Sequence, residues 1–221
     1  MIAARRPVTG GQTADLVWPV AEAAMAGFVV REVGVGARTL PHPGGDDLSS
    51  LLADVVGSLF SDMEAKATFW QRARTAMPLK PMAEPKHSGT EEIEDVREMV
   101  ESFRSAYGNL QEIWSLVLPP QSWLGWKRLS RVTAEEFEIP SSLWARTVYD
   151  FLLGYHSRAI NRGHLLGSLT PLYLAWVASH LKRSAGDSAL AAFHVDETAA
   201  AFVVEKPYVV ARWRWPDRFN P

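Results

Sequence analysis

The sequence predicts a mainly helical fold, a helical bundle with one small β element near its start. Apolar residues recur at intervals of three and four through most of the 221 residues, which is the spacing of one face of an α-helix. Only residues 28–35 (FVVREVGV) combine β-branched side chains with the short length of a strand. Proline and glycine separate several of the apolar segments, where they end helices.

Residues 1–76 are expected to form a helix, a strand, a loop and a long helix. Thr13 is the expected N-cap of the first helix, and Gly27 its end. The segment Pro41-His42-Pro43-Gly44-Gly45 is a loop by composition, because each proline fixes its φ angle and glycine permits unusual backbone angles. The helix that follows carries an apolar stripe that continues towards Trp70.

An aspartate pair precedes this long helix. Asp46 and Asp47 follow the Pro/Gly loop, and carboxylates at a helix start act first as caps that interact favourably with the helix dipole. A divalent ion that holds a diphosphate would instead need carboxylates that converge from a rigid strand end and loop. We therefore interpret the pair as a helix cap.

Residues 77–90 interrupt the helical pattern with three prolines, Pro78, Pro81 and Pro85. Such a segment is typical of an irregular linker or surface loop. It divides the chain into residues 1–76 and a helical domain of residues 91–221.

The helical domain is expected to begin with two helices separated by Gly108. Ser88 and Glu91 resemble a capping box for the first, and the second is expected from Asn109 to the Pro119-Pro120 pair. Thr133 and Glu136 form another capping-box pattern.

Three further helices are expected after Pro140, over residues 165–183 and over residues 188–205. The first of them carries the broadest apolar face in the chain. The tail, residues 206–221, is rich in tryptophan and arginine, and we expect it to pack back on the bundle.

Composition excludes several classes of function. There are no cysteines, which excludes disulfides and thiolate metal sites and fits a reducing compartment. Lys and Arg total 23 against 25 Asp and Glu, with no basic face of the kind that binds nucleic acid. No secretory signal follows Arg5 and Arg6, and polar residues interrupt the most apolar run, residues 165–181. We expect a cytoplasmic protein that binds neither nucleic acid nor a membrane.

Two groups of side chains are candidate binding sites. His156, Arg158, Arg162 and His164 could share a positive pocket for a carboxylate or phosphate, or form a polar seam between two helices. The arginines and tryptophans of the tail could stack on bases or sugars, the alternative to packing on the bundle. No Gly-rich phosphate loop, serine nucleophile elbow or zinc-binding His-Glu-x-x-His pattern occurs.

Two long stretches carry a resemblance to a known family. The first is residues 13–60, TADLVWPVAEAAMAGFVVREVGVGARTLPHPGGDDLSSLLADVVGSLF. The second is residues 141–182, SSLWARTVYDFLLGYHSRAINRGHLLGSLTPLYLAWVASHLK, followed by KPYVVARWRWPDRFNP. They resemble the C-terminal part of a group of glycosyltransferases that includes the mannosylglycerate and glucosyl-3-phosphoglycerate synthases.

The resemblance implies that residues 1–76 are the remnant edge of a nucleotide-sugar (GT-A-like) α/β fold. It also implies a divalent metal, Mg²⁺ or Mn²⁺, and transfer of a hexose from a sugar nucleotide to a small anionic acceptor of the glycerate type, with retained configuration. Asp15 matches the acidic residue that lines the sugar and acceptor site. The family's metal-binding histidine falls on Leu40, and the nearest histidine is His42. The candidate acceptor contacts are Arg38, His156, Arg158 and Arg162.

Such enzymes place the diphosphate with an Asp-x-Asp motif in a nucleotide-binding half, and this sequence contains no Asp-x-Asp. We therefore expect no transferase activity from the chain alone. It would be either a fragment of a longer reading frame or the partner of a separate nucleotide-binding chain. The alternative is a non-catalytic helical module for oligomerisation or partner binding. In either case we expect a homo-oligomer, with a dimer the simplest form.

Overall fold

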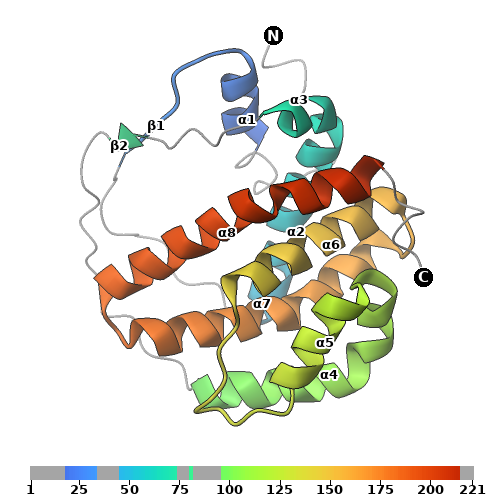
Figure 1. Ribbon diagram of the computed structural model, residues 1–221, viewed down its shortest axis with the longest axis vertical. Helices are drawn as coiled ribbons and strands as arrows, with labels where there is room; N and C mark the ends of the chain where they lie inside the picture. The colour runs from blue at the N-terminus through green and yellow to red at the C-terminus, as the bar shows by residue number, and fades with distance from the viewer. Residues whose placement is uncertain (1–17, 34–44, 74–79, 82–95, 215–221) are drawn as a thin grey trace. The chain divides into compact units, whose positions relative to one another are not determined.

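The computed structural model describes residues 18–33, 45–73, 80–81 and 96–214, and the chain divides into two compact units, Met1–Gly89 and Thr90–Pro221 (Figure 1). The described residues are mainly helical, as predicted.

The described residues of the first unit form three helices and two very short strands: α1 (Trp18–Met25), β1 (Arg31–Glu32), α2 (Gly45–Ala65), α3 (Ala67–Arg72) and β2 (Lys80–Pro81). Helix α1 ends as expected at Gly27, which has a φ of +77° and so adopts the left-handed backbone that favours glycine at a helix end. The two strands pair in parallel, with Arg31 opposite Lys80 and Glu32 opposite Pro81.

The strand prediction for this unit was wrong in extent. Of residues 28–33, the described part of the predicted strand, only Arg31–Glu32 form a strand, and residues 28–30 lie outside regular structure. Their partner, Lys80–Pro81, lies in the segment predicted to be irregular. Proline has no N–H to donate to a neighbouring strand, so it is found in edge strands where no such hydrogen bond is required. A pair of two-residue strands meets this condition.

In the second unit, residues 96–214 form a bundle of five helices: α4 (Val96–Val117), α5 (Pro120–Leu129), α6 (Ser141–Ser157), α7 (Arg162–Ser184) and α8 (Ser188–Arg214) (Figure 1). Helix α6 packs most extensively on α8, and α4 on α7. No helix in the described ranges combines the length and hydropathy that a membrane crossing requires.

Aromatic rings fill the centre of the second unit. Phe103 stacks on Trp114 at a centroid distance of 6.4 Å and lies 5.6 Å from both Trp126 and Phe137. The indole of Trp114 donates a hydrogen bond to the Ser168 carbonyl over 2.9 Å. This contact fixes α4 against α7, and aromatic pairs in these geometries stabilise a core beyond their buried area.

Three features of this unit differ from the sequence prediction. Gly108 does not end a helix, because α4 runs through it to Val117 and the burial of Tyr107 and Trp114 outweighs a glycine penalty of about 1 kcal/mol. Helix α5 was not predicted. Thr133 accepts a hydrogen bond from the Glu136 N–H, yet the segment is a turn and not a helix.

Helix α8 is longer than predicted. It continues past Glu205 and through Pro207 to Arg214, so the start of the predicted tail is helical. Pro207 has no N–H to donate to the carbonyl one turn earlier in the helix. Because Pro207 is exposed, water can hydrogen-bond to that carbonyl instead.

Candidate functional site

A buried carboxylate at the centre of the second unit joins three helices. Asp150 of α6 stands in the sequence between two buried residues, Tyr149 and Phe151, and its own side chain has no exposed surface. A buried charge is tolerated only when it is paired and hydrogen-bonded. Its position therefore requires donors from the helices packed against α6.

Those donors come from α5 and α8. Tyr208 donates to Asp150 from its hydroxyl over 2.5 Å, and Ser122 donates over 3.1 Å. Arg212 forms an ion pair with the same carboxylate and also donates to the Tyr208 hydroxyl over 2.7 Å. Burial raises the pKa of Asp150 to about 7, against the lowering effect of these three donors. Burial likewise raises the pKa of Tyr208, as does the neighbouring carboxylate.

A second ion pair lies next to this network. Arg146 of α6 donates from Nε to Glu205 of α8 over 2.8 Å and from Nη1 to Gln121 over 3.0 Å. Its guanidinium lies 5.3 Å from the centre of the Tyr208 ring. Because donors already surround Asp150 and its side chain is closed to solvent, this carboxylate is suited to fixing α8 on α6 and not to contacting a substrate.

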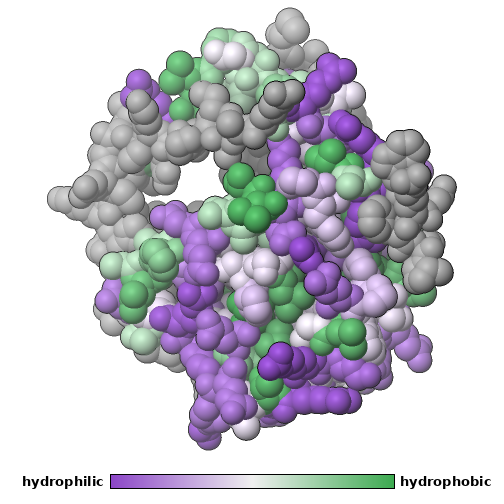
Figure 2. Space-filling model, viewed as in Figure 1, coloured by the Kyte–Doolittle hydropathy of each residue, from purple (hydrophilic) through white to green (hydrophobic). Residues whose placement is uncertain are grey.

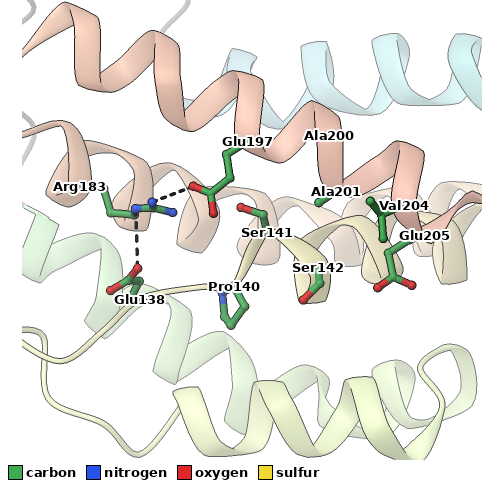
Figure 3. A pocket seen from close by; sticks show the side chains of 10 residues that line it. All are labelled: Glu138, Pro140, Ser141, Ser142, Arg183, Glu197, Ala200, Ala201, Val204 and Glu205. Carbon is green, nitrogen blue, oxygen red and sulfur yellow. Dashed lines mark hydrogen bonds and ion pairs between the residues drawn. The ribbon is translucent and has the colours of Figure 1, made fainter. Parts of the chain in front are cut away.

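A groove of about 640 Å³ opens beside Glu205 (Figure 3). It lies between the first turn of α6, the end of α7 and the middle of α8. Arg183 crosses it and pairs with Glu197 over 2.8 Å and with Glu138 over 3.7 Å. Ser141 lines the groove, and its buried hydroxyl has no hydrogen-bond partner. Glu138, Glu197 and Glu205 against Arg183 give the groove an excess of negative charge.

A histidine pair connects α7 to α8 near this groove. Nδ1 of His180 lies 2.8 Å from Nδ1 of His194, and the two rings stack at 5.0 Å. A hydrogen bond between two Nδ1 atoms needs one ring to carry the proton there and the other to lack it. Trp176 stacks on both rings. Burial lowers the pKa of His194, with smaller lowering contributions from Arg183 and His180.

The structure places the predicted acceptor contacts at the junction of α6 and α7. His156 stacks on Trp213 with ring centroids 3.9 Å apart. The Arg162 guanidinium lies 3.8 Å above the Tyr155 ring, and its Nε donates to the Tyr155 carbonyl. Arg158 ends α6 in a left-handed conformation, with a φ of 55°. The ring contact of His156 joins α6 to α8, and that of Arg162 joins α7 to α6.

The contacts of Trp213 and Arg212 confirm that the start of the tail packs back on the bundle. Asp15, Arg38, Leu40 and His42 lie outside the described residues, and the side chains of Asp46 and Asp47 are not described. Within the described ranges, no group of three or more His, Asp or Glu side chains is placed to hold a metal ion.

The Asp150 network was not predicted from the sequence. Asp150 lies 62 positions from Arg212, so no local spacing relates them. The available signal was an aspartate in the middle of an apolar helix face, which calls for a cationic or donor partner elsewhere.

No protein-family model, no curated protein and no solved structure matches this chain.

Proposed function

We propose that the chain is the C-terminal part of a nucleotide-sugar-dependent hexosyltransferase that acts on a small anionic acceptor of the glycerate type. The observation that carries the proposal is the resemblance of residues 13–60 and 141–182 to that family. The second stretch corresponds to α6 and α7 and includes Asp150, the residue on which α8 is anchored.

The exposed apolar residues around β1 support this proposal. Phe28, Val29 and Val33 flank the strand, and all three are exposed. Large apolar side chains beside a two-residue sheet are the surface expected where a larger sheet packs. In the proposed enzyme, this surface contacts the nucleotide-binding domain.

The proposed site residues follow from the resemblance. Asp15 lines the sugar and acceptor site, a divalent ion (Mg²⁺ or Mn²⁺) binds the diphosphate with His42 as a candidate ligand, and Arg38, His156, Arg158 and Arg162 contact the acceptor. The family position of the metal ligand falls on Leu40. Without an Asp-x-Asp motif, the chain alone would not stabilise the leaving diphosphate.

Calorimetric titration with GDP-mannose and UDP-glucose, each with Mg²⁺ or Mn²⁺, tests the proposal. Saturable, metal-dependent binding that Asp15→Ala weakens would support it. The matched control is Glu112→Ala, which removes an exposed carboxylate of α4. Absence of saturable binding to either sugar nucleotide would remove the support for a sugar site in this chain.

The second candidate is an association module, and the surface of α8 favours it. Seven large apolar side chains are exposed between residues 96 and 214, and five of them belong to α8: Leu190, Phe193, Val195, Val203 and Val204. Hydrophobic side chains are visible along the path of α8 in Figure 2. Exposed apolar residues gathered on one element mark interaction surfaces. Light scattering of the full chain tests this candidate, which predicts an assembly larger than a monomer.

A further inference from the structure

The exposed side of α8 has the spacing of a helix-pairing seam. Positions 193, 196, 200, 203, 207, 210 and 214 follow one another at alternating intervals of three and four. All are exposed except Val210, which is half-buried. The buried residues His194, Thr198, Glu205 and Val209 lie on the opposite side of the helix. We name these seven positions the α8 strip, because a 3,4 repeat places them in one line along the helix.

The α8 strip carries a negative charge towards one end and a positive charge at the other. Asp196 lies in its first half, and residues 188–205 contain no lysine or arginine. Arg214 lies at its other end. The centre consists of apolar residues, with Val203 and its neighbour Val204 exposed by 48% and 74%. A partner that covers this strip must therefore offer a cation at one end and a carboxylate at the other.

The α8 strip is itself such a partner when it is turned end over end. In an antiparallel pair centred on residue 205, Asp196 of each copy lies opposite Arg214 of the other. Val203 then lies opposite Pro207, and Ala200 opposite Val210. Self-complementarity of this kind is what a two-fold interface requires, since residue i contacts residue j and j contacts i. A parallel pair would instead bring like charges together.

We propose that two copies of this chain associate through antiparallel pairing of their α8 strips. The inference rests on the association function proposed above and specifies its partner and surface. From position 196 to position 214 the overlap is about 27 Å, at the α-helical rise per residue. The groove of Figure 3 borders the strip, because Ala200 lines both, so side chains of the second copy meet a hollow along one edge.

A charge exchange tests the pairing. Asp196→Arg and Arg214→Asp, made singly in the full chain, should each raise the dimer dissociation constant by about tenfold or more, because each places like charges opposite one another twice per dimer. The double variant, with both changes, should return the constant to near the wild-type value. Sedimentation equilibrium measures the constants, and circular dichroism checks that the variants fold. Glu112→Arg on α4 is the control.

The outcomes distinguish an error in the proposed α8 surface from an error in the proposed association function. A wild-type chain that is monomeric at high micromolar concentration overturns both the pairing and the association module. If the chain dimerises and neither single variant weakens the dimer, pairing through the α8 strip is wrong, although the association function is still supported. If both single variants weaken the dimer and the double variant does not recover, antiparallel pairing through Asp196 and Arg214 is wrong.

Discussion

The two units of the chain differ in what holds their helices together. The second unit buries an aromatic cluster around Phe103 and Trp114 and a hydrogen-bonded carboxylate, Asp150. In the described part of the first unit, Phe60 and Lys66 are the only buried side chains. A helix acquires most of its stability from the apolar face that it buries. The comparison therefore assigns the larger share of the folding free energy to the second unit.

Polar contacts reinforce this contrast. In the first unit, Lys66 pairs with Asp62 and with Glu22 over 3.2 Å, and the Trp70 indole donates to the Met63 carbonyl over 2.8 Å. These contacts join α3 to α2 and join Lys66, the residue between those two helices, to α1 and α2. In the second unit, the Asp150 network joins α5, α6 and α8. Loss of a contact should therefore remain local in the first unit and be global in the second.

The largest expected effect is that of Trp114→Ala. The change removes a fully buried ring and its hydrogen bond to Ser168, and deletion of a buried tryptophan costs about 3–5 kcal/mol. Denaturant unfolding followed by circular dichroism measures the loss. Leu116→Ala, in the same helix but 73% exposed, should cost about 0.5 kcal/mol or less. Equal effects of the two changes would contradict the placement of the core.

The positions of two long helices could be predicted from the sequence. Helix α6 begins at Ser141, directly after Pro140 as predicted, and α7 (Arg162–Ser184) covers the predicted residues 165–183, because apolar residues recur at helical spacing along both. The prediction ended a helix at Gly108, because glycine costs a helix about 1 kcal/mol. The sequence alone does not show the core contacts on either side of Gly108 that outweigh this cost. For α5, the signal was Pro120, a proline in the first turn of a helix.

The candidate site was less predictable because its contacts are distant in sequence. A single charged residue on an apolar helix face, such as Asp150 or Arg146, indicates that an oppositely charged or hydrogen-bonding partner exists. It does not indicate which residue of the sequence that partner is. The contact between His180 and His194 depends on how α7 and α8 pack, and no local spacing encodes that packing. Sequence patterns therefore predicted elements, and tertiary packing determined which side chains meet.

The next effect concerns the pH dependence of the second unit. Asp150 has an unfolded pKa of 3.8 and a folded pKa of about 7. A carboxyl group whose pKa rises on folding stabilises the protein at and below pH 4, and this stabilisation is lost as pH rises to 7. The free energy of unfolding should fall over that interval by up to about 1.4 kcal/mol per pH unit relative to Asp150→Asn.

Paired urea titrations of the two proteins at pH 4, 5, 6 and 7 measure this difference. The asparagine keeps the size of the side chain and removes its titration. A stability difference between the two proteins that is constant across the interval, or that changes in the opposite direction, would show that Arg212 and Tyr208 keep Asp150 ionised in the folded state.

A smaller effect of the opposite sign is expected from His194. Its folded pKa lies below the ordinary 6.5, so its stabilising contribution is present above pH 6.5 and is lost as pH falls. The groups that face it are His180 and Arg183 of α7, Glu197 of α8 and Glu138. His194→Phe should make stability below pH 6.5 less dependent on pH, as measured by thermal unfolding. His164→Phe, at an exposed position, is the control for the substitution itself.

The smallest expected effect on the whole protein is that of Lys66→Met. The change removes the cation shared by Asp62 and Glu22, while a methionine retains most of the apolar contact of the lysine side chain. Hydrogen exchange should accelerate at the amides of α1 and at the end of α2, whereas amides of α4, α6 and α7 should keep their protection because the second unit has its own core. If α4 and α6 lose protection in parallel with α1, the two units unfold as one. The aromatic core around Trp114 would then stabilise both units together.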